Sequence, residues 1–248
     1  MQAWKSNRGL TVHYLDRSGI EAPECLRDYD YQSQNWKDLV SPCKQRLRHQ
    51  LVEMQGDPKV STADGAEEYG VRCAYCEGPI HHDGHIEHFR RKNKKHFPHL
   101  TFAWENLFLV CASNNHCGHY KDRPSSDPYQ PDDLVKPDEH DPEKFFFFSS
   151  SGEVRVRNGL EDADHHMAKE TIRVFNLNHN ALQGKRRRVV LPYVKQLEEI
   201  EEFLALAESE VDREELESEL LAVISDQIEN TKYDYYSATV WDFYRSKV

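Results

Sequence analysis

The chain lacks any long apolar segment. Hydrophobic residues make up 38% of it, below the ~45–50% of an ordinary globular domain, and its mean hydropathy is -0.83. No run approaches the ~18 apolar residues that a membrane span needs. The first residues, Met1-Gln2-Ala3-Trp4-Lys5, lead into no apolar stretch of the kind found in secretory signals. The sequence therefore predicts a cytoplasmic protein with no membrane partner.

Cysteine is also sparse, with six residues among 248. In a cytoplasmic chain, such cysteines serve as thiols or metal ligands rather than as a disulfide framework. Cys25 and Cys43 stand alone in the sequence, and we expect each to be a small buried apolar residue. The other four fall in two pairs, Cys73 with Cys76 and Cys111 with Cys117.

These two pairs predict a structural zinc site. The C-x₂-C spacing of Cys73-Ala74-Tyr75-Cys76 lets two thiolates converge on one ion, and four thiolates give a closed tetrahedral site. The C-x₅-C spacing of the second pair needs a wider turn, which Ser113-Asn114-Asn115 can supply. His116 remains an alternative to Cys117 as the fourth ligand, and two unrelated pairs of free thiols remain the alternative to a metal site. A metal site would tie together the chain on both sides of residues 77–110.

Basic charge is in short supply, since 43 acidic residues outnumber 32 basic ones and the formal net charge is -11. A chain with this balance is not a general nucleic-acid coat protein. Two basic runs interrupt it, residues 90–95 and 185–188, whereas residues 198–219 hold eleven acids and one arginine. Each basic run is either a solvated face or a local phosphate grip.

Composition and hydrophobic spacing divide the chain into four parts. We expect an N-terminal helical flank over residues 1–70, a compact core over 71–123, a proline-rich connector with a hairpin over 124–163, and a helical region over 164–248. Two apolar runs in the core are short enough to be strands, His85-Ile86-Glu87-His88-Phe89 and Leu107-Phe108-Leu109-Val110. The expected fold class is therefore α+β.

Two of these parts contain helices with a readable pattern. In the first part, Ser41 as the N-cap and Pro42 as the first helical residue begin a helix that Gly56 ends, and residues 57–70 read as a loop. In the last part, five apolar residues follow the alternating spacing of three and four that is typical of a seam between paired helices: Leu197, Ile200, Leu204, Ala207 and Val211. This seam is either the inner face of an ordinary helical hairpin or a docking surface for a partner.

Between the cysteine pairs lies His85-Ile86-Glu87-His88. On a strand, His85 and Glu87 share one face, and a twist at the strand end can bring Glu87 and His88 around one site. A carboxylate beside a histidine suits a metal ligand paired with a general base, although a surface His–Glu pair is the ordinary interpretation of such a tetrapeptide. Three neighbouring features favour a site, namely the basic run from Arg90, Asn106 at the head of the second strand, and His119 after the last cysteine.

The order of these motifs resembles the HNH, or ββα-metal, endonuclease family. The resemblance is carried by Cys-x₂-Cys at 73–76, Ile-Glu-His-Phe-Arg at 86–90, Trp-Glu-Asn-Leu-Phe-Leu-Val-Cys at 104–111 and Cys-Gly-His-Tyr-Lys at 117–121. More narrowly, Ala168-Lys169-Glu170-Thr171-Ile172 and Leu177-Asn178 extend a likeness to the PtuB-type HNH subunits of Septu and retron-type antiphage systems. The resemblance implies a small zinc-stabilised ββα-metal core flanked by an N-terminal helix and a C-terminal helical region.

The resemblance also implies a role for each matching residue. His88 would be the general base, Glu87 a ligand of a catalytic Mg²⁺ or Mn²⁺ ion, and Asn106 a brace for the loop that carries the base. Glu87 stands where the family has Asp, and Gly118 stands where it has a metal-binding Asn. We expect His119 to replace that Asn, with His85 as a further candidate ligand. The residues expected to hold phosphates are Arg90, Arg91, Lys92, Lys94, Lys95 and Lys121.

The function implied by the resemblance is a metal-dependent endonuclease that hydrolyses phosphodiester bonds of DNA or RNA as the effector of an antiphage complex. Its implied partners are a PtuA-type ATPase and a retron reverse transcriptase with its noncoding RNA and DNA. A zinc-stabilised nucleic-acid-binding module without cleavage is the alternative, and a scaffold subunit built on the acidic helices is a third possibility. A binding module needs the zinc and the basic residues, but it does not need His88, Glu87 and His119 together.

Overall fold

The computed structural model describes residues 14–56, 70–80, 84–205 and 210–246, so the expected loop over 57–70 lies almost wholly outside the described residues. The helices and strands in chain order are α1 (Ser41–Gln55), β1 (His85–His88), β2 (Leu107–Val110), α2 (Cys117–Asp122), α3 (Pro142–Phe145), β3 (Phe146–Phe148), β4 (Val154–Val156), α4 (Asp162–Val174), α5 (Asn180–Ala205), α6 (Glu210–Asn230) and α7 (Ser237–Arg245). Short 3₁₀ turns connect them, η2 (Glu24–Asp28), η3 (Trp36–Asp38), η4 (Pro98–Leu100), η5 (Trp104–Asn106) and η6 (Pro131–Asp133). The described residues form an α+β fold, as the sequence predicts.

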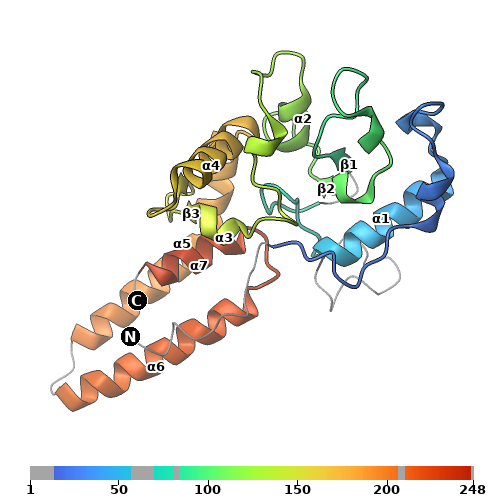
Figure 1. The fold of residues 1–248 in the computed structure, drawn as a ribbon. Helices are drawn as coiled ribbons and strands as arrows, with labels where there is room; N and C mark the ends of the chain where they lie inside the picture. Colours follow the sequence, from blue (N-terminus) through green and yellow to red (C-terminus); the bar gives the residue numbers. More distant parts are fainter. Residues whose placement is uncertain (1–13, 57–69, 81–83, 206–209, 247–248) are drawn as a thin grey trace.

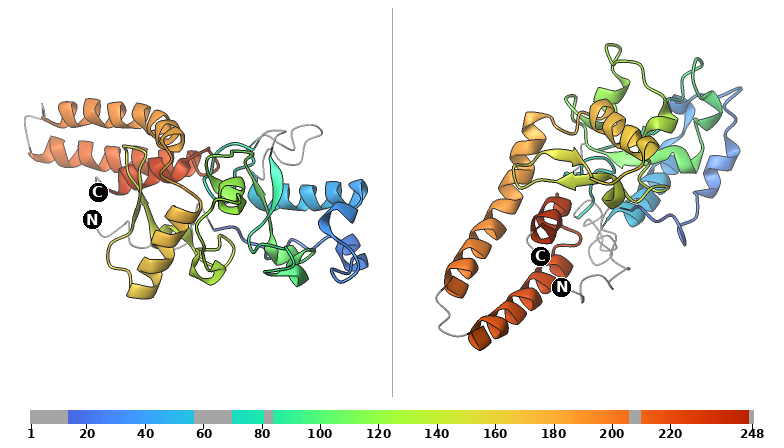
Figure 2. Two further views of the ribbon diagram at one scale, coloured as in Figure 1. Left: turned by 90° about the horizontal axis from the view of Figure 1, so that it is seen from above. Right: turned by 60° about the vertical axis from the view of Figure 1, so that its left-hand side comes forward.

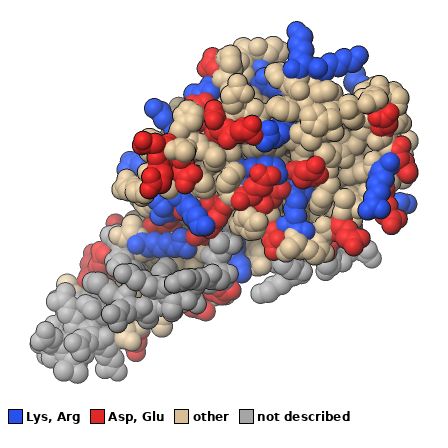
Figure 3. Space-filling view, viewed as in Figure 1, with Lys and Arg blue, Asp and Glu red and all other residues tan. Residues whose placement is uncertain are grey.

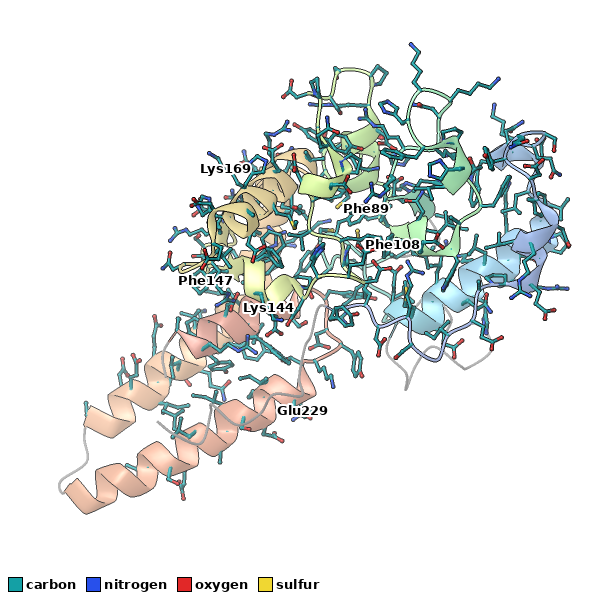
Figure 4. The ribbon with its side chains drawn as sticks, viewed as in Figure 1. Phe89, Phe108, Lys144, Phe147, Lys169 and Glu229 are labelled. Atoms are coloured by element: carbon teal, nitrogen blue, oxygen red, sulfur yellow. A yellow bond between two sulfur atoms is a disulfide. The ribbon has the colours of Figure 1, made fainter. Side chains whose placement is uncertain are left out.

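β1 and β2 form an antiparallel pair in the body of the molecule (Figure 1), with His85 opposite Val110 and His88 opposite Leu107. β2 coincides with the apolar run from which it was expected, and β1 ends one residue before the end of its run. All four residues of β2 are buried. Phe89 and Phe108, labelled in Figure 4, pack beside the pair with their ring centroids 6.3 Å apart. The β1–β2 pair is therefore part of the apolar core.

α1 packs along β2. It begins at Ser41, with Val40 in the cap position, one residue earlier than expected, and Gly56 ends it. Its buried apolar face is made by Cys43, Leu47, Leu51, Val52 and Met54. The Gln55 side chain is also buried, and it donates to the Leu109 carbonyl at 2.8 Å and accepts from the Leu109 N–H at 2.8 Å. These two hydrogen bonds from the Gln55 side chain to the Leu109 backbone hold α1 against β2.

Cys25 and Cys43 form a disulfide, which shows that the expectation of two unpaired apolar residues is wrong. The bond joins η2 to the first turn of α1. The two residues are 18 positions apart, and nothing in their local spacing indicates the contact, because the intervening loop alone brings them together. The other four cysteines are free thiols.

β3 and β4 form the expected hairpin, and α7 packs against β3 and α5. Every residue of α7 from Ser237 to Tyr244 is buried. Asp242 accepts a hydrogen bond from the Phe148 N–H at 2.8 Å and pairs with Arg157 at 2.7 Å. α7 is therefore a core element, although its sequence was not singled out from the rest of the helical region.

α5 and α6 run side by side and extend away from the body (Figures 1 and 2). Leu197 is buried with Ile224 and Ile228 in a cluster that α7 completes. The first residue of the expected seam thus faces the chain's own helices, and the seam residues Leu204, Ala207 and Val211 lie outside those whose side chains are described. No helix in the described part of the chain is long and apolar enough to cross a membrane.

Candidate metal centre and the adjoining histidine site

The four paired cysteines converge from separate stretches of the chain. Cys73 and Cys76 flank one turn, Cys111 follows β2, and Cys117 begins α2. Their sulfur atoms all lie within 4.8 Å of one another. The Sγ atoms of Cys73 and Cys117 are 3.7 Å apart, and those of Cys76 and Cys111 are 3.9 Å apart. This largely buried cluster can hold a structural metal ion.

The backbone at both cysteine turns is held in an unusual conformation. Glu77 has a φ of 59° and Cys117 a φ of 62°, in the left-handed region that costs a non-glycine residue about 1–3 kcal/mol. The Cys73 N–H donates to the Gly78 carbonyl at 2.8 Å, and the Cys117 N–H donates to the Phe175 carbonyl at 2.8 Å. These bonds hold the turns in the shape that brings the thiols together.

His116 adjoins the thiol cluster and does not displace a cysteine from it. Its Nδ1 lies 3.2 Å from the Cys117 Sγ and 3.7 Å from the Cys111 Sγ. Burial disfavours the charged imidazole, but hydrogen bonds to Cys111 and Cys76 outweigh it and raise the pKa of His116 to about 9. A protonated His116 offsets part of the negative charge that four thiolates bring together.

The carboxylate of Glu87 is buried between β1 and α2. Its Oε1 lies 2.8 Å from the Lys121 Nζ, and its Oε2 lies 3.4 Å from the His85 Nε2. Burial by itself raises the pKa of this carboxyl group, but the positive charge of Lys121 and the hydrogen bond from His85 lower it to about 2. Glu87 is therefore ionised at neutral pH, as a metal ligand has to be.

His85 and His119 lie beside this carboxylate, with their rings stacked and the centroids 4.0 Å apart. Both ring nitrogens of His85 are buried; Nε2 faces the Glu87 carboxylate, and Nδ1 has no hydrogen-bond partner among the described residues. Burial, followed by the neighbouring His85, lowers the pKa of His119. In the described part of the chain, only the cysteines gather three or more candidate ligand atoms within 4.8 Å, so these two histidines and Glu87 form a looser group.

His88 ends β1, and its two ring nitrogens have different partners. Nε2 lies 3.0 Å from the Thr101 carbonyl oxygen, which can only accept, so Nε2 carries the proton and Nδ1 presents a lone pair. The Trp36 ring packs edge-on against the imidazole, with the centroids 4.5 Å apart. Burial, and next the positive charge of Lys92, lowers the pKa of His88 to about 3. His88 is therefore a neutral imidazole in a fixed tautomer at pH 7.

Asn106 braces the loop between β1 and β2. Its side chain accepts from the Arg90 N–H at 2.7 Å and donates to the carbonyls of Arg90 at 3.0 Å and Leu100 at 3.2 Å. The residue is buried. Three bonds from one side chain thus close the loop that follows His88, in the position where the HNH resemblance implies a brace.

Lys121 was expected to hold a phosphate, but its burial excludes this role. It is fully buried, and its Nζ donates to the carbonyls of His88 at 2.8 Å and Phe89 at 3.1 Å while it pairs with Glu87. Its charge is used inside the protein, where it ties α2 to the end of β1.

The basic run of residues 90–95 divides into two groups. Arg90 pairs with Asp132, and Arg91 pairs with Asp122. The other three cations have no carboxylate partner among the described residues: Lys92, Lys94 and Lys95. Lys and Arg side chains project from the upper edge of the molecule in Figure 3, above the loop between β1 and β2. The surface offered to an anion is therefore smaller than the sequence suggests.

A hollow of about 280 Å³ opens beside His88, between the basic run and the end of α2. Arg123 lies on its wall, with its guanidinium 3.8 Å from the centroid of the Tyr120 ring. Arg123 and Trp36 are not among the site residues that the sequence predicts. Arg123 had a usable signal, since it is a cation two residues beyond Lys121, whereas Trp36 reaches His88 only through the folding of the N-terminal segment.

Comparison with known proteins adds no assignment, since the chain matches no family model and no curated protein matches it.

Proposed function

We propose that the chain is a metal-dependent endonuclease of the HNH type, which hydrolyses phosphodiester bonds of DNA or RNA. The observation that carries this proposal is the state of His88. Its Nε2 is fixed on the Thr101 carbonyl, its Nδ1 presents the lone pair, and the residue lines a hollow bordered by cations. A general base needs an acceptor atom held in one orientation beside its substrate, and a phosphate group is attracted to such a hollow.

His88 acts on a water molecule in this mechanism. The water oxygen bonds to phosphorus in line with the leaving oxygen, the phosphorus–oxygen bond opposite breaks, and the water proton passes to Nδ1. The resulting imidazolium is stabilised by the Thr101 carbonyl and by the adjacent carboxylate of Glu87. The free protein holds the pKa of His88 at about 3, and a phosphate brought beside it favours the protonated form.

Glu87, His85 and His119 are the residues that would hold the catalytic divalent ion, Mg²⁺ or Mn²⁺. The fit is supported by the ionised carboxylate and by the buried Nδ1 of His85, which lacks a partner among the described residues. A bound ion would neutralise charge on the phosphate and on the leaving oxygen. Lys121 already holds one oxygen of Glu87, which keeps the carboxylate oriented.

Zinc is the ion we propose for the four cysteines. With Zn–S bonds of about 2.3 Å, the sulfur atoms of a tetrahedral site lie about 3.8 Å apart. The sulfur distances of Cys73 to Cys117 and of Cys76 to Cys111, 3.7 and 3.9 Å, agree with that edge length. Four thiolates leave no open position, so this zinc would stabilise the fold and take no part in hydrolysis.

A nucleic-acid-binding module without cleavage is the second candidate, and one observation favours it. Lys121 neutralises Glu87 within the protein, as in a purely structural ion pair. Such a module would use the cysteine site and Lys92, Lys94 and Lys95, and it would have no need of the acceptor nitrogen on His88.

Cleavage of plasmid DNA and of RNA, with and without added Mg²⁺ or Mn²⁺, separates the two candidates. The variants are His88→Ala and, as a control in the same loop, the exposed His96→Ala. Loss of a general base lowers the rate about 10²–10⁴-fold, so His88→Ala should fall by that factor while His96→Ala keeps the wild-type rate. A wild type that binds nucleic acid and cleaves neither substrate with either ion would establish the second candidate.

The partners we propose follow from the HNH resemblance. A nuclease with little sequence selectivity endangers its own host, which gives a reason for control by a PtuA-type ATPase and by a retron reverse transcriptase with its RNA and DNA. Co-expression of the chain with such an ATPase, followed by affinity purification and a cleavage assay, tests both the complex and its control of activity.

A further inference from the structure

Lys92 covers the acceptor nitrogen of His88. Its Nζ lies 3.2 Å from the His88 Nδ1 and 5.9 Å from the centroid of the Trp36 ring. Because Nε2 already donates to the Thr101 carbonyl, Nδ1 is the only lone pair of this imidazole. A water molecule cannot give its proton to Nδ1 while the ammonium occupies it.

Lys92 also differs from the arginines beside it, because it has no anion. Arg90 and Arg91 pair with Asp132 and Asp122, whereas no carboxylate among the described residues forms an ion pair with Lys92. The side chain is half-buried, and this burial is the main reason why the pKa of Lys92 is lowered. An ammonium in this position is poorly compensated by a neutral imidazole, and an oxyanion would satisfy it better.

The hollow next to Lys92 has a second cation in the same condition. Arg123 stacks on Tyr120 and has no carboxylate partner in the described part of the chain. Asp122 is the acid on the wall of the hollow, and it is engaged by Arg91 at 2.9 Å and by Lys121 at 3.1 Å. The hollow therefore offers two uncompensated cations to a ligand and no free carboxylate to repel it.

We propose that this hollow is the subsite for one phosphodiester group, held by Lys92 and Arg123, and that Lys92 leaves the His88 Nδ1 for a phosphate oxygen when the group binds. The proposal rests on the proposed endonuclease function, in which Nδ1 is the base. The same movement of the Lys92 side chain binds the phosphate group and exposes the lone pair on the His88 Nδ1. In the free protein the base stays blocked, and only a phosphodiester opens it.

The ¹⁵N signals of the His88 side chain, recorded at one fixed pH without added divalent ion, test the displacement. The probe is a short DNA duplex and, in a parallel sample, an RNA duplex of the same sequence. In the wild type, the duplex should shift the Nδ1 signal as the bond from Lys92 is lost. In Lys92→Met, the signal of the free protein should already be shifted, and the duplex should change it little. Lys94→Met removes an exposed lysine of the same run that does not contact His88; it should show the wild-type Nδ1 signal in the free protein and at saturating duplex, even where its duplex affinity is lower.

Duplex affinity measured against salt concentration supplies the second readout. Each lost phosphate contact lowers the slope of log affinity against log salt by about 0.9 on duplex DNA, so Lys92→Met and Arg123→Met should each lose about that amount. Lys92→Arg keeps the positive charge and should retain the wild-type slope. A Lys92→Met variant with the wild-type affinity and slope would overturn the proposal. A wild-type Nδ1 signal that a saturating duplex leaves in place would overturn it as well.

These measurements also separate this inference from the nuclease proposal. If the duplex displaces Lys92 but no variant or condition gives cleavage, the phosphate subsite stands and the nuclease assignment fails. If the wild type cleaves while Lys92 stays on His88, the nuclease assignment stands and the displacement fails.

Discussion

Gly118 leaves the space that Glu87 fills. A Cβ on residue 118 would lie 2.7 Å from the Glu87 Cδ and 2.8 Å from its Oε2, closer than non-bonded atoms approach. The HNH pattern has the shorter Asp and an Asn at these positions. The long carboxylate side chain of Glu87 and the missing side chain of Gly118 therefore compensate each other in volume.

This relationship predicts that Gly118→Ala destabilises the protein and that Glu87→Asp relieves the effect. Glu87 has little room to move, because Lys121 and His85 hold its two oxygens. Overpacking of this kind costs about 1–3 kcal/mol, and urea unfolding should show that loss in the free energy of unfolding of Gly118→Ala. The double variant should recover part of it, as a favourable coupling of about 0.5–3 kcal/mol.

Gly184→Ala is the matched control, because Gly184 also lies in a helix, α5. No atom lies within 4 Å of a Cβ added there, so the substitution should stabilise the protein by about 0.5–1 kcal/mol through its helix preference. The compensation is refuted if Gly118→Ala gains stability like the control, or if Glu87→Asp adds its own loss without any recovery.

Removing one thiol should remove the metal and the fold together. Cys73→Ser leaves three thiolates at a buried site, and the free energy of metal binding is part of the free energy of folding in such sites. Elemental analysis should find one zinc per wild-type chain and none in Cys73→Ser, whose thermal unfolding should lose cooperativity. Cys25→Ser, which opens the disulfide only, should keep its zinc. A wild type that contains no zinc and unfolds cooperatively would contradict the assignment.

His88 should make the stability of the protein sensitive to acid. Burial and the charge of Lys92 lower its pKa from 6.5 to about 3. Between these values the unfolded chain binds a proton that the folded chain does not, so the free energy of unfolding falls as the pH drops below about 6.5. Glu87, with its pKa lowered from 4.5 to about 2, loses its stabilising contribution only as the pH falls below about 4.5.

His116 and His119, whose pKa values are also shifted, contribute between about pH 7 and about pH 5 as well, so the contribution of His88 is the difference between the wild type and His88→Gln in urea unfolding over this interval. His88→Gln, which cannot be protonated, should flatten the fall in stability across this interval. His96→Gln, at an exposed position of the following loop, should leave the wild-type slope. An equally steep fall in His88→Gln would show that another group binds the proton.

The parts of the fold that the sequence predicted are those that depend on neighbours along the chain. The spacing of Leu47 and Leu51 indicates α1, and short apolar runs bounded by turns indicate β1, β2 and the β3–β4 hairpin. α7 was not singled out because its burial depends on β3 and α5, which are distant in sequence. The Cys25–Cys43 disulfide was not predicted, because it also joins residues that are distant in sequence.

The residue types in the sequence indicate the candidate site, but the contacts that each side chain makes can be read only from distances in the structure. The order of the motifs predicts His88, Glu87 and Asn106 as site residues, and in the structure they lie around one strand end. Lys121 and Lys92 look alike in the sequence, but one is fully buried on Glu87 and the other lies at a hollow beside His88. The two lysines differ in burial, and the spacing of charges along the sequence does not predict which of them is buried.

The proposed ATPase should bind α6 through an exposed apolar side chain. Leu221 and Val223 are exposed on this helix, at 37% and 41% of their surface, whereas the expected seam residue Leu197 is buried at 4%. Residues two positions apart point to different sides of a helix, so the two substitutions together probe both sides. Truncation after Leu191 would also remove α7 from the core, so substitutions test the interface more sharply. The combined Leu221→Ser and Val223→Ser variant should lose co-purification with the ATPase and keep the wild-type melting temperature. Leu197→Ser should lower the melting temperature instead, since it weakens the α5–α7 cluster. Unchanged co-purification of the double variant would move the interface to the N-terminal helix or to the proline-rich connector.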